Sequence, residues 1–124
     1  MRVEQIDFIS IPTRDAERAA AWYRDVLELP ESVVSQGEVE TPNVTLSFWE
    51  PERENLPFVA NTAGFAVRVP DVAEARAELE ARGVEFIAKT LDSGVCHFAA
   101  CRDLDGNTVI LHRRYAARNP RQAT

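Results

Sequence analysis

The sequence predicts an α+β protein built from two tandem βαβββ modules, and three observations support this prediction. Apolar residues alternate over short segments bounded by proline or glycine, which is typical of strands. Two longer segments place apolar residues three and four positions apart, as amphipathic helices do. The order strand, helix, three strands occurs twice, and the copies align at a period of about 56 residues when Asp15 is placed over Asp71.

The first module is predicted over residues 3–54. Its opening strand covers 3–11 and ends at Pro12, because proline donates no backbone hydrogen bond. A helix follows to about Leu29, with Thr13 or Asp15 as its N-cap. Strands are then expected over 33–35, 38–41 and 43–50. The apolar helix face comprises Ala19, Trp22, Tyr23, Val26 and Leu27. In the last strand Val44, Leu46 and Phe48 alternate with Thr45, Ser47 and Trp49.

The second module is predicted over residues 63–113, after a polar linker over 55–62. A strand over 64–69 leads to a helix that begins at Asp71 and stops at Gly83, a residue suited to the left-handed position after a helix. Further strands are expected over 84–89, 94–101 and 108–112. The sequence DLDGN at 103–107 is a strong turn signal between the last two. A basic tail covers 114–124.

Composition limits the function classes. The 124 residues suit a single domain, and 45% apolar with 27% charged residues is typical of a globular protein. Twenty acids against 14 bases give a net charge of −6, which makes nucleic acid an improbable partner. No apolar run approaches the roughly 20 residues of a membrane span, and acids interrupt the N-terminal segment where a secretion signal would be apolar. We therefore expect a cytoplasmic protein with no membrane partner.

Seven acids and one base lie between Glu28 and Glu54. This stretch is either an ordinary solvated surface or an acidic lip that attracts a cationic ligand. Cys96 and Cys101 are five residues apart on one predicted strand, about 16 Å, which is too far for a disulfide.

Three segments carry a resemblance to a known family. The runs IPTRDAERAAAWYRDVLEL at 11–29, FAVRVPDVAEARAELEARGVEF at 65–86 and CRDLDGNTVIL at 101–111 resemble vicinal-oxygen-chelate proteins, which include glyoxalase I, bleomycin-resistance proteins and extradiol dioxygenases. The resemblance implies one glyoxalase-like domain over 1–124, in which the paired modules form a curved mixed sheet around a cavity. It also implies a homodimer. The chain departs from the family pattern at Glu28, where a glycine is usual, and at Leu104, where proline is common.

The resemblance also locates the metal site of the family's enzymes. Metal-using members place His, Gln or Glu on the first and last strands of each module. Three of these positions fall on Phe8, Gly64 and Ile110, and the fourth falls on Leu46 or Phe48, with Glu50 as the nearest acid. None of the four offers a donor atom, whereas divalent cations need several polar ligands. We therefore predict no metal and no other cofactor.

The two histidines, His97 and His112, are the candidate catalytic residues. If the turn is tight, with Arg102 opposite Asn107, both share a sheet face with Thr108 and Ile110 and point into the cavity. The pair could then act as general acid and base, bind a displaced metal with Glu50 or Cys101, or hydrogen-bond a ligand. A one-residue bulge would break this pairing, and the histidines would then lie at strand ends in contact with water or backbone.

These observations lead to three functional hypotheses. The first is a metal-free protein that sequesters or carries a small molecule in an apolar-floored cavity, with Trp49 as a platform for a cationic or aromatic ligand. The second is an enzyme of lyase, isomerase or dioxygenase type that uses the histidines or a rebuilt metal site. The third is a dimeric scaffold. The expected ligand-binding residues are Phe8, Phe48, Trp49, Glu50, His97, Thr108, Ile110 and His112.

Overall fold

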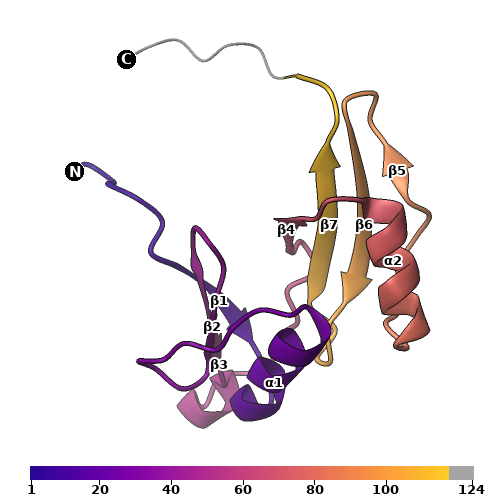
Figure 1. The fold of residues 1–124 in the computed structure, drawn as a ribbon. Coiled ribbons are helices and arrows are strands. Elements are labelled where there is room, and N and C mark those ends of the chain that lie inside the picture. Colours follow the sequence, from indigo (N-terminus) through magenta and orange to yellow (C-terminus); the bar gives the residue numbers. More distant parts are fainter. Residues whose placement is uncertain (118–124) are drawn as a thin grey trace. The chain divides into compact units, whose positions relative to one another are not determined.

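The computed structural model describes residues 1–117, which form two compact units (Figure 1). Unit 1 comprises Met1–Ala63 and the turn Asp103–Asn107, and unit 2 comprises Gly64–Arg102 and the chain from Thr108 onward. Each unit has one helix and one mixed sheet, so the predicted α+β class is confirmed. The predicted basic tail lies outside the described residues from position 118 on.

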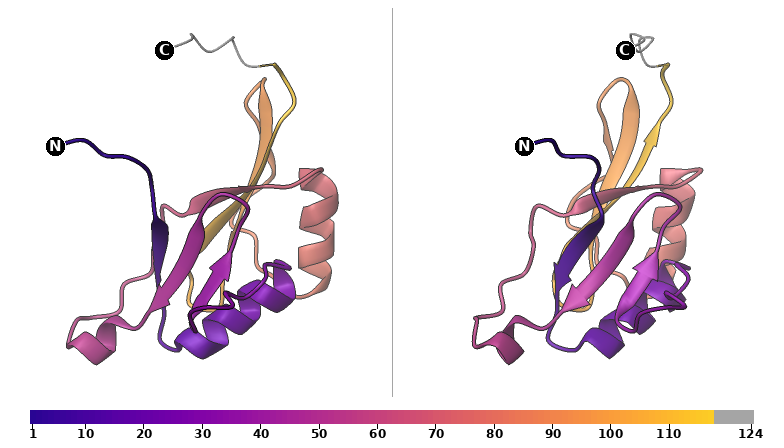
Figure 2. Two further views of the ribbon diagram at one scale, coloured as in Figure 1. Left: turned by 60° about the vertical axis from the view of Figure 1, so that its left-hand side comes forward. Right: turned by 90° about the vertical axis from the view of Figure 1, so that its left-hand side faces the viewer.

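Unit 1 contains a three-stranded sheet in the order β1-β3-β2. Strand β1 (Phe8–Pro12) runs parallel to β3 (Thr45–Trp49), and β2 (Glu38–Glu40) runs antiparallel to it. Helix α1 (Ala16–Val26) packs against β2 and β3 (Figure 2). A short 3-10 helix, η1 (Pro51–Glu54), follows β3. The carboxylate of Asp15 accepts a hydrogen bond from the Arg18 backbone amide, so Asp15, and not Thr13, is the N-cap of the two candidates.

The core of unit 1 lies between α1 and one face of this sheet. Tyr23 is fully buried, and its ring lies 4.8 Å from the ring of Phe48. Ile11, Val39 and Leu46 are buried on the same sheet face. This arrangement confirms the alternation along β3, and it confirms Ala19 and Tyr23 of the predicted helix face. The other predicted residues of that face are half-buried, and Ala20, which was not predicted, is buried.

Two predicted strands of unit 1 differ from the structure. Residues 33–35 form no strand, and Val33 and Val34 are exposed; one isolated bridge, between Glu31 and Val39, occupies this region. The first strand begins at Phe8 rather than at residue 3, because its pairing with β3 starts at Phe8 opposite Thr45. Apolar residues at 3 and 6 therefore signalled a strand where no partner strand is present among the described residues.

Unit 2 contains a four-stranded sheet in the order β4-β7-β6-β5. Its strands are β4 (Phe65–Arg68), β5 (Leu91–Asp92), β6 (Cys96–Arg102) and β7 (Thr108–Arg114). Helix α2 (Val72–Ala81) packs against β6 and β7, capped by Asp71 and followed by Gly83 at φ 85°, as the sequence predicted. Buried residues of the sheet on the α2 side are Ala99, Cys101, Val109 and Leu111. The predicted strand over 84–89 is reduced to a single bridge between Phe86 and Cys101.

The turn between β6 and β7 sets the register of unit 2, and the structure has the one-residue shift that the sequence left open as the alternative to a tight turn. Arg102 pairs with Thr108, not with Asn107. The carboxylate of Asp103 accepts hydrogen bonds from the backbone amides of Asp105 and Asn107, and the Asp103 amide donates to the Asn107 carbonyl. These bonds close a five-residue turn, so the ladder begins one position later. A shift of one residue moves every side chain of one strand to the opposite face relative to its partner.

Candidate functional site

Each sheet has one face covered by its own helix and a second face that the helix does not cover. We call the second face the open face. In unit 1 it carries the residues that alternate with the core: Phe8, Ser10, Glu38, Glu40, Thr45, Ser47 and Trp49. In unit 2 it carries Ala66, Arg68, Leu91, Cys96, Phe98, Ala100, Arg102, Thr108, Ile110, His112 and Arg114.

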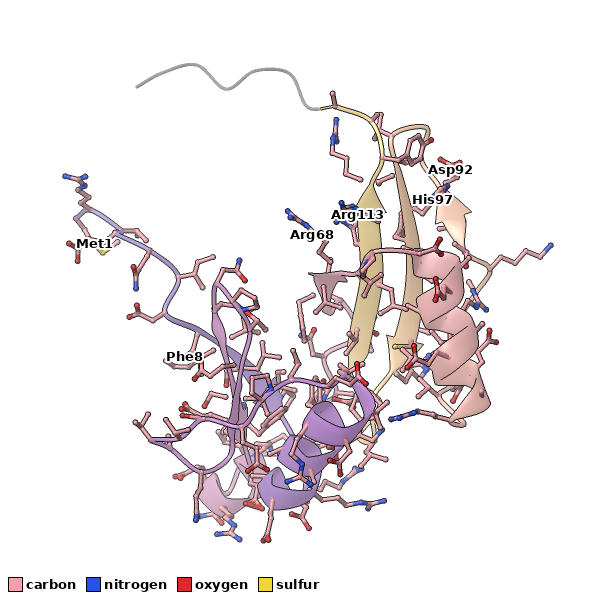
Figure 3. All side chains as sticks on the ribbon, viewed as in Figure 1. Met1, Phe8, Arg68, Asp92, His97 and Arg113 are labelled. Carbon is pink, nitrogen blue, oxygen red and sulfur yellow. The ribbon has the colours of Figure 1, made fainter. Side chains whose placement is uncertain are left out.

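The open face of unit 1 holds two of the predicted ligand-binding residues. Phe8, labelled in Figure 3, is 56% exposed, and Trp49 is 38% exposed. The Glu40 carboxylate accepts a 2.8 Å hydrogen bond from the Thr45 hydroxyl, which fixes one acid of this face. Trp49 thus lies on the same face as acidic side chains, as the platform hypothesis requires.

Phe48 and Glu50 do not belong to this open face. Phe48 is only 6% exposed and packs on Tyr23 on the α1 side, so it cannot form a cavity floor together with Phe8. Because β1 and β3 are in register, the neighbour of Phe8 on β3 is Thr45, and Ser47 is the next residue on that face. Glu50 lies beyond the end of β3 and forms a 2.9 Å ion pair with Arg53.

The acidic stretch is also less uniform than its sequence suggests. Glu31 forms a 2.7 Å ion pair with Arg24, which also contacts Asp25 at 2.7 Å. These acids, the Asp25 side chain first, raise the pKa of the Arg24 guanidinium. Two of the seven acids, Glu31 and Glu50, are therefore paired with arginines, which reduces the negative charge of the stretch.

The two histidines lie on opposite faces of the unit 2 sheet, which corrects the shared-cavity hypothesis. His112 is opposite Phe98 and lies on the open face with Ile110 and Thr108. His97 is opposite Arg113 and lies on the α2 side. The five-residue turn causes this separation, and it rules out an acid–base pair or a shared metal site made of both histidines.

His97 belongs instead to a small polar cluster at the end of the sheet near β5 (Figure 3). Its Nε2 lies 3.3 Å from an oxygen of Asp92, and its ring lies 4.8 Å from the ring of Tyr115. The Tyr115 hydroxyl donates a 2.7 Å hydrogen bond to Asp92. This bond, followed by those from Gly94 and His97, lowers the pKa of Asp92, and it raises the pKa of Tyr115.

The remaining open-face residues of unit 2 differ in their polar contacts. Ile110 is half-buried between Ala66 and Ala100, its partners on the neighbouring strands. Thr108 is 5% exposed, and its hydroxyl is buried without a hydrogen-bond partner among the described residues. An unsatisfied buried hydroxyl is unusual and calls for an explanation such as a bound group.

The residues at the positions that the resemblance assigned to metal ligands offer few donor atoms. Phe8, Gly64 and Ile110 have no donor atoms, and Thr45 and Ser47, the β3 residues on the face of Phe8, offer only hydroxyls. Within residues 1–117 no group of three or more His, Cys, Asp or Glu side chains is placed to hold a metal. Cys96 and Cys101 are not joined by a disulfide, as their spacing predicted.

Sequence reasoning missed Arg68, Asp92 and Tyr115. Arg68 could have been found, because alternation along FAVRV places Ala66 and Arg68 on one face and Phe65 and Val67 on the other. Asp92 and Tyr115 come together only through the pairing of β5 with β6 and the return of the chain after β7, which no local pattern indicates.

Comparisons with known proteins give a family and a fold. The family model described as Glyoxalase/Bleomycin resistance protein/Dioxygenase superfamily matches residues 5–111. A member of that superfamily from Sphaerobacter thermophilus has 20% sequence identity and a TM-score of 0.74, over 89% of this chain and 97% of that one. A comparison with curated protein sequences finds no match.

Two further structures carry functional names. A lactoylglutathione lyase from Agrobacterium tumefaciens has 18% identity and a TM-score of 0.73, over 90% of this chain and 94% of its own. An antibiotic binding protein from a Streptomyces species has 20% identity and a TM-score of 0.68, over 92% and 98%. At these identities the similarity establishes the fold alone. No helix among the described residues is long and apolar enough to cross a membrane.

Proposed function

Because the chain belongs to the Glyoxalase/Bleomycin resistance protein/Dioxygenase superfamily, we propose that it binds a small molecule on its open sheet faces and sequesters or carries it without a metal. The observation that carries the proposal is the open face of unit 2. There an apolar floor around Ile110 lies beside the His112 imidazole and the unsatisfied Thr108 hydroxyl. Ligand sites in proteins commonly combine such an apolar surface with a few polar groups that orient the ligand.

The donor set supports the metal-free part of the proposal. Glyoxalase-type and dioxygenase-type chemistry needs a metal, and the corresponding positions here hold Phe8, Gly64 and Ile110. His112 remains a single imidazole, and selective metal binding needs three or four ligands held in place by their neighbours. The superfamily also contains binding proteins, as the name of the Streptomyces relative illustrates.

A thermal-shift screen tests this function. The protein is heated with Ni²⁺, Mn²⁺ or Zn²⁺, and separately with a panel of aromatic, cationic and anionic compounds. Because a ligand that binds only the folded state raises Tm with its occupancy, we expect stabilisation by a class of organic compounds and none by the metals. Elemental analysis of protein purified without added metal should give well under one equivalent.

The opposite result would favour the enzyme hypothesis. A metal-dependent rise in Tm that disappears in His112→Ala would mean that a rebuilt metal site uses His112. The same screen on His97→Ala is the matched control, because His97 lies on the α2 side of the sheet.

We also propose that the protein is a homodimer. Within unit 1 the residues Val3, Ile6 and Phe8 are exposed along one continuous segment, and such apolar surface is commonly covered by a second copy. Light scattering at micromolar concentration should give twice the chain mass of 13.9 kDa. A mass equal to one chain would contradict the dimer.

A further inference from the structure

The strand residues on the open face of unit 2 include bases and no acid, although the whole chain is acidic. The strand residues on this face are all described, and none is Asp or Glu. Its charged members are Arg68, Arg102 and Arg114, and the face also holds the imidazole of His112. In a chain with a net charge of −6, this concentration favours an anionic ligand on this face.

Two of the three arginines are already engaged within their own unit. Arg102 lies 3.9 Å from the Glu85 carboxylate, and Arg114 donates a 2.8 Å hydrogen bond to the Ala116 carbonyl. Arg68 is different: it is exposed on the edge strand β4 and forms no ion pair or side-chain hydrogen bond with residues 1–117 (Figure 3). Its guanidinium therefore keeps its full donor capacity.

His112 lies beside this arginine. The two residues are register partners on the parallel strands β4 and β7, so their side chains leave the same face of adjacent strands, which are about 4.8 Å apart. The His112 side chain also forms no hydrogen bond with the described residues. A planar guanidinium next to an imidazole donor can hold two oxygens of one anionic group.

The surface next to this pair is apolar, and most of its side chains are short. One register row further along the strands, Ala66, Ile110 and Ala100 lie side by side on β4, β7 and β6. Two of these three side chains are single methyl groups, whereas the row above contains Arg68, His112 and Phe98. Thr108, with its unsatisfied hydroxyl, lies four residues from His112 on β7, about 13 Å along the strand.

We propose that the open face of unit 2 binds an organic anion whose carboxylate, sulfonate or phosphate group contacts Arg68 and His112. The apolar body of the ligand lies over the Ala66, Ile110 and Ala100 row, and Thr108 hydrogen-bonds a polar atom at its far end. This inference rests on the proposed small-molecule function and adds the chemical class of the ligand. A cationic ligand is expected only beside Trp49 and the acids of unit 1. Those residues do not belong to the unit 2 sheet, so the two expectations concern different surfaces.

Two fluorescent probes test the inference. 1-Anilinonaphthalene-8-sulfonate and N-phenyl-1-naphthylamine share the same apolar rings, and only the first has an anionic group. We expect the sulfonate to bind the wild-type protein about tenfold more tightly, and Arg68→Gln to remove about tenfold of its affinity, a factor typical of a charge-assisted hydrogen bond. The affinity of the neutral probe should stay within about twofold in that variant.

Two further variants control for charge and folding. Arg113→Gln removes the same charge from the neighbouring strand, but Arg113 lies on the α2 side, so the sulfonate affinity should be unchanged. Arg68→Lys keeps the charge without the planar donor pair and should recover part of the affinity. Circular dichroism and the thermal transition of each variant establish that the fold is retained.

The outcomes separate the two proposals. Equal binding of both probes to the wild-type protein would overturn the anion inference and leave small-molecule binding intact. An equal loss of sulfonate affinity in Arg68→Gln and Arg113→Gln would also overturn the anion inference. It would mean that the positive charges attract the sulfonate at a distance and that Arg68 does not contact it. A change in dimer mass with unaltered probe binding would mean that Arg68 serves a second copy of the chain. Absence of binding by either probe would count against the proposed function itself.

Discussion

Among the polar side chains of unit 1, we expect the loss of Asp103 to destabilise the unit most. The residue is 9% exposed, and its carboxylate accepts four hydrogen bonds. The Tyr23 hydroxyl donates at 2.7 Å, the backbone amides of Asp105 and Asn107 at 2.8 and 2.9 Å, and the Asn107 side-chain amide at 3.0 Å. The carboxylate thus fastens the turn 103–107 to helix α1.

The substitution Asp103→Ala removes all four acceptor contacts at once. It removes the Asp103 acceptor of the fully buried Tyr23 hydroxyl and of one Asn107 side-chain amide hydrogen. The loss of the acceptor of a buried donor costs about 1–3 kcal/mol, so two such losses, reduced by partial relaxation, predict about 2–5 kcal/mol. That is a large part of the 5–15 kcal/mol that is typical for a whole domain.

Urea unfolding followed by circular dichroism measures this loss. The companion variant Tyr23→Phe should cost about 1–2 kcal/mol in the wild-type background and much less in Asp103→Ala, because its partner is then already gone. Asp7→Ala is the control: Asp7 is exposed and contacts only the Gln5 side chain, so the change should stay within about 0.5 kcal/mol. A loss below about 1 kcal/mol for Asp103→Ala, or an equal cost of Tyr23→Phe in both backgrounds, would refute the reasoning.

Three other predictions concern particular residues. Glu28 has φ 58° just after α1, so Glu28→Gly should raise the free energy of unfolding by about 0.5–1 kcal/mol in urea, and Glu28→Ala should not. The pKa of Tyr115 is raised because its hydroxyl donates to Asp92; the stabilisation is full below pH 10.0 and is lost as pH rises through the folded-state pKa. In an absorbance titration of tyrosinate, the ionisation of Tyr115 should disappear in Tyr115→Phe, and it should shift to lower pH in Asp92→Asn. Finally, His112→Ala should weaken binding of the sulfonate probe while His97→Ala leaves it unchanged, and equal effects would contradict the assigned faces.

Local signals in the sequence predicted the two α-helices well. Asp15 and Asp71 precede each helix as capping residues, and Gly83 follows the second in a left-handed conformation. These features depend on hydrogen bonds and steric limits within a few residues, so the local sequence is enough to predict them. Family membership was predicted in the same way, from three short motifs in order.

The candidate site was harder to predict because it depends on register. The family's turn motif was visible, but the number of turn residues before pairing resumes was not. Hydrogen bonds to the Asp103 carboxylate decide that number, and the result places His97 and His112 on opposite faces. Phe48 was misplaced for a related reason: it was expected to bind the same ligand as Phe8, but the parallel register places Thr45 beside Phe8 and Phe48 on the opposite face. Contacts between residues far apart in sequence, such as Arg68 beside His112, follow from register alone.

The last prediction concerns Gly64, where the packing of the backbone leaves no room for a side chain that could ligate a metal. The residue has φ +74°, and a Cβ at this position would lie 2.4 Å from the Thr108 carbonyl oxygen and 2.9 Å from its Cβ. No side chain fits there without a shift of β7, so Gly64→Ala should cost about 2–4 kcal/mol from overpacking and backbone strain together. Gly94 is the matched control, because its φ is +92° but nothing lies within 4 Å of the place that a methyl group would occupy; Gly94→Ala should cost only about 1 kcal/mol. If Gly64→Ala costs no more than Gly94→Ala in urea unfolding, the close approach to Thr108 does not constrain the chain. If the difference is found, Gly64→His cannot restore a metal ligand by one substitution, because the strand pairing itself occupies the space that the imidazole would need.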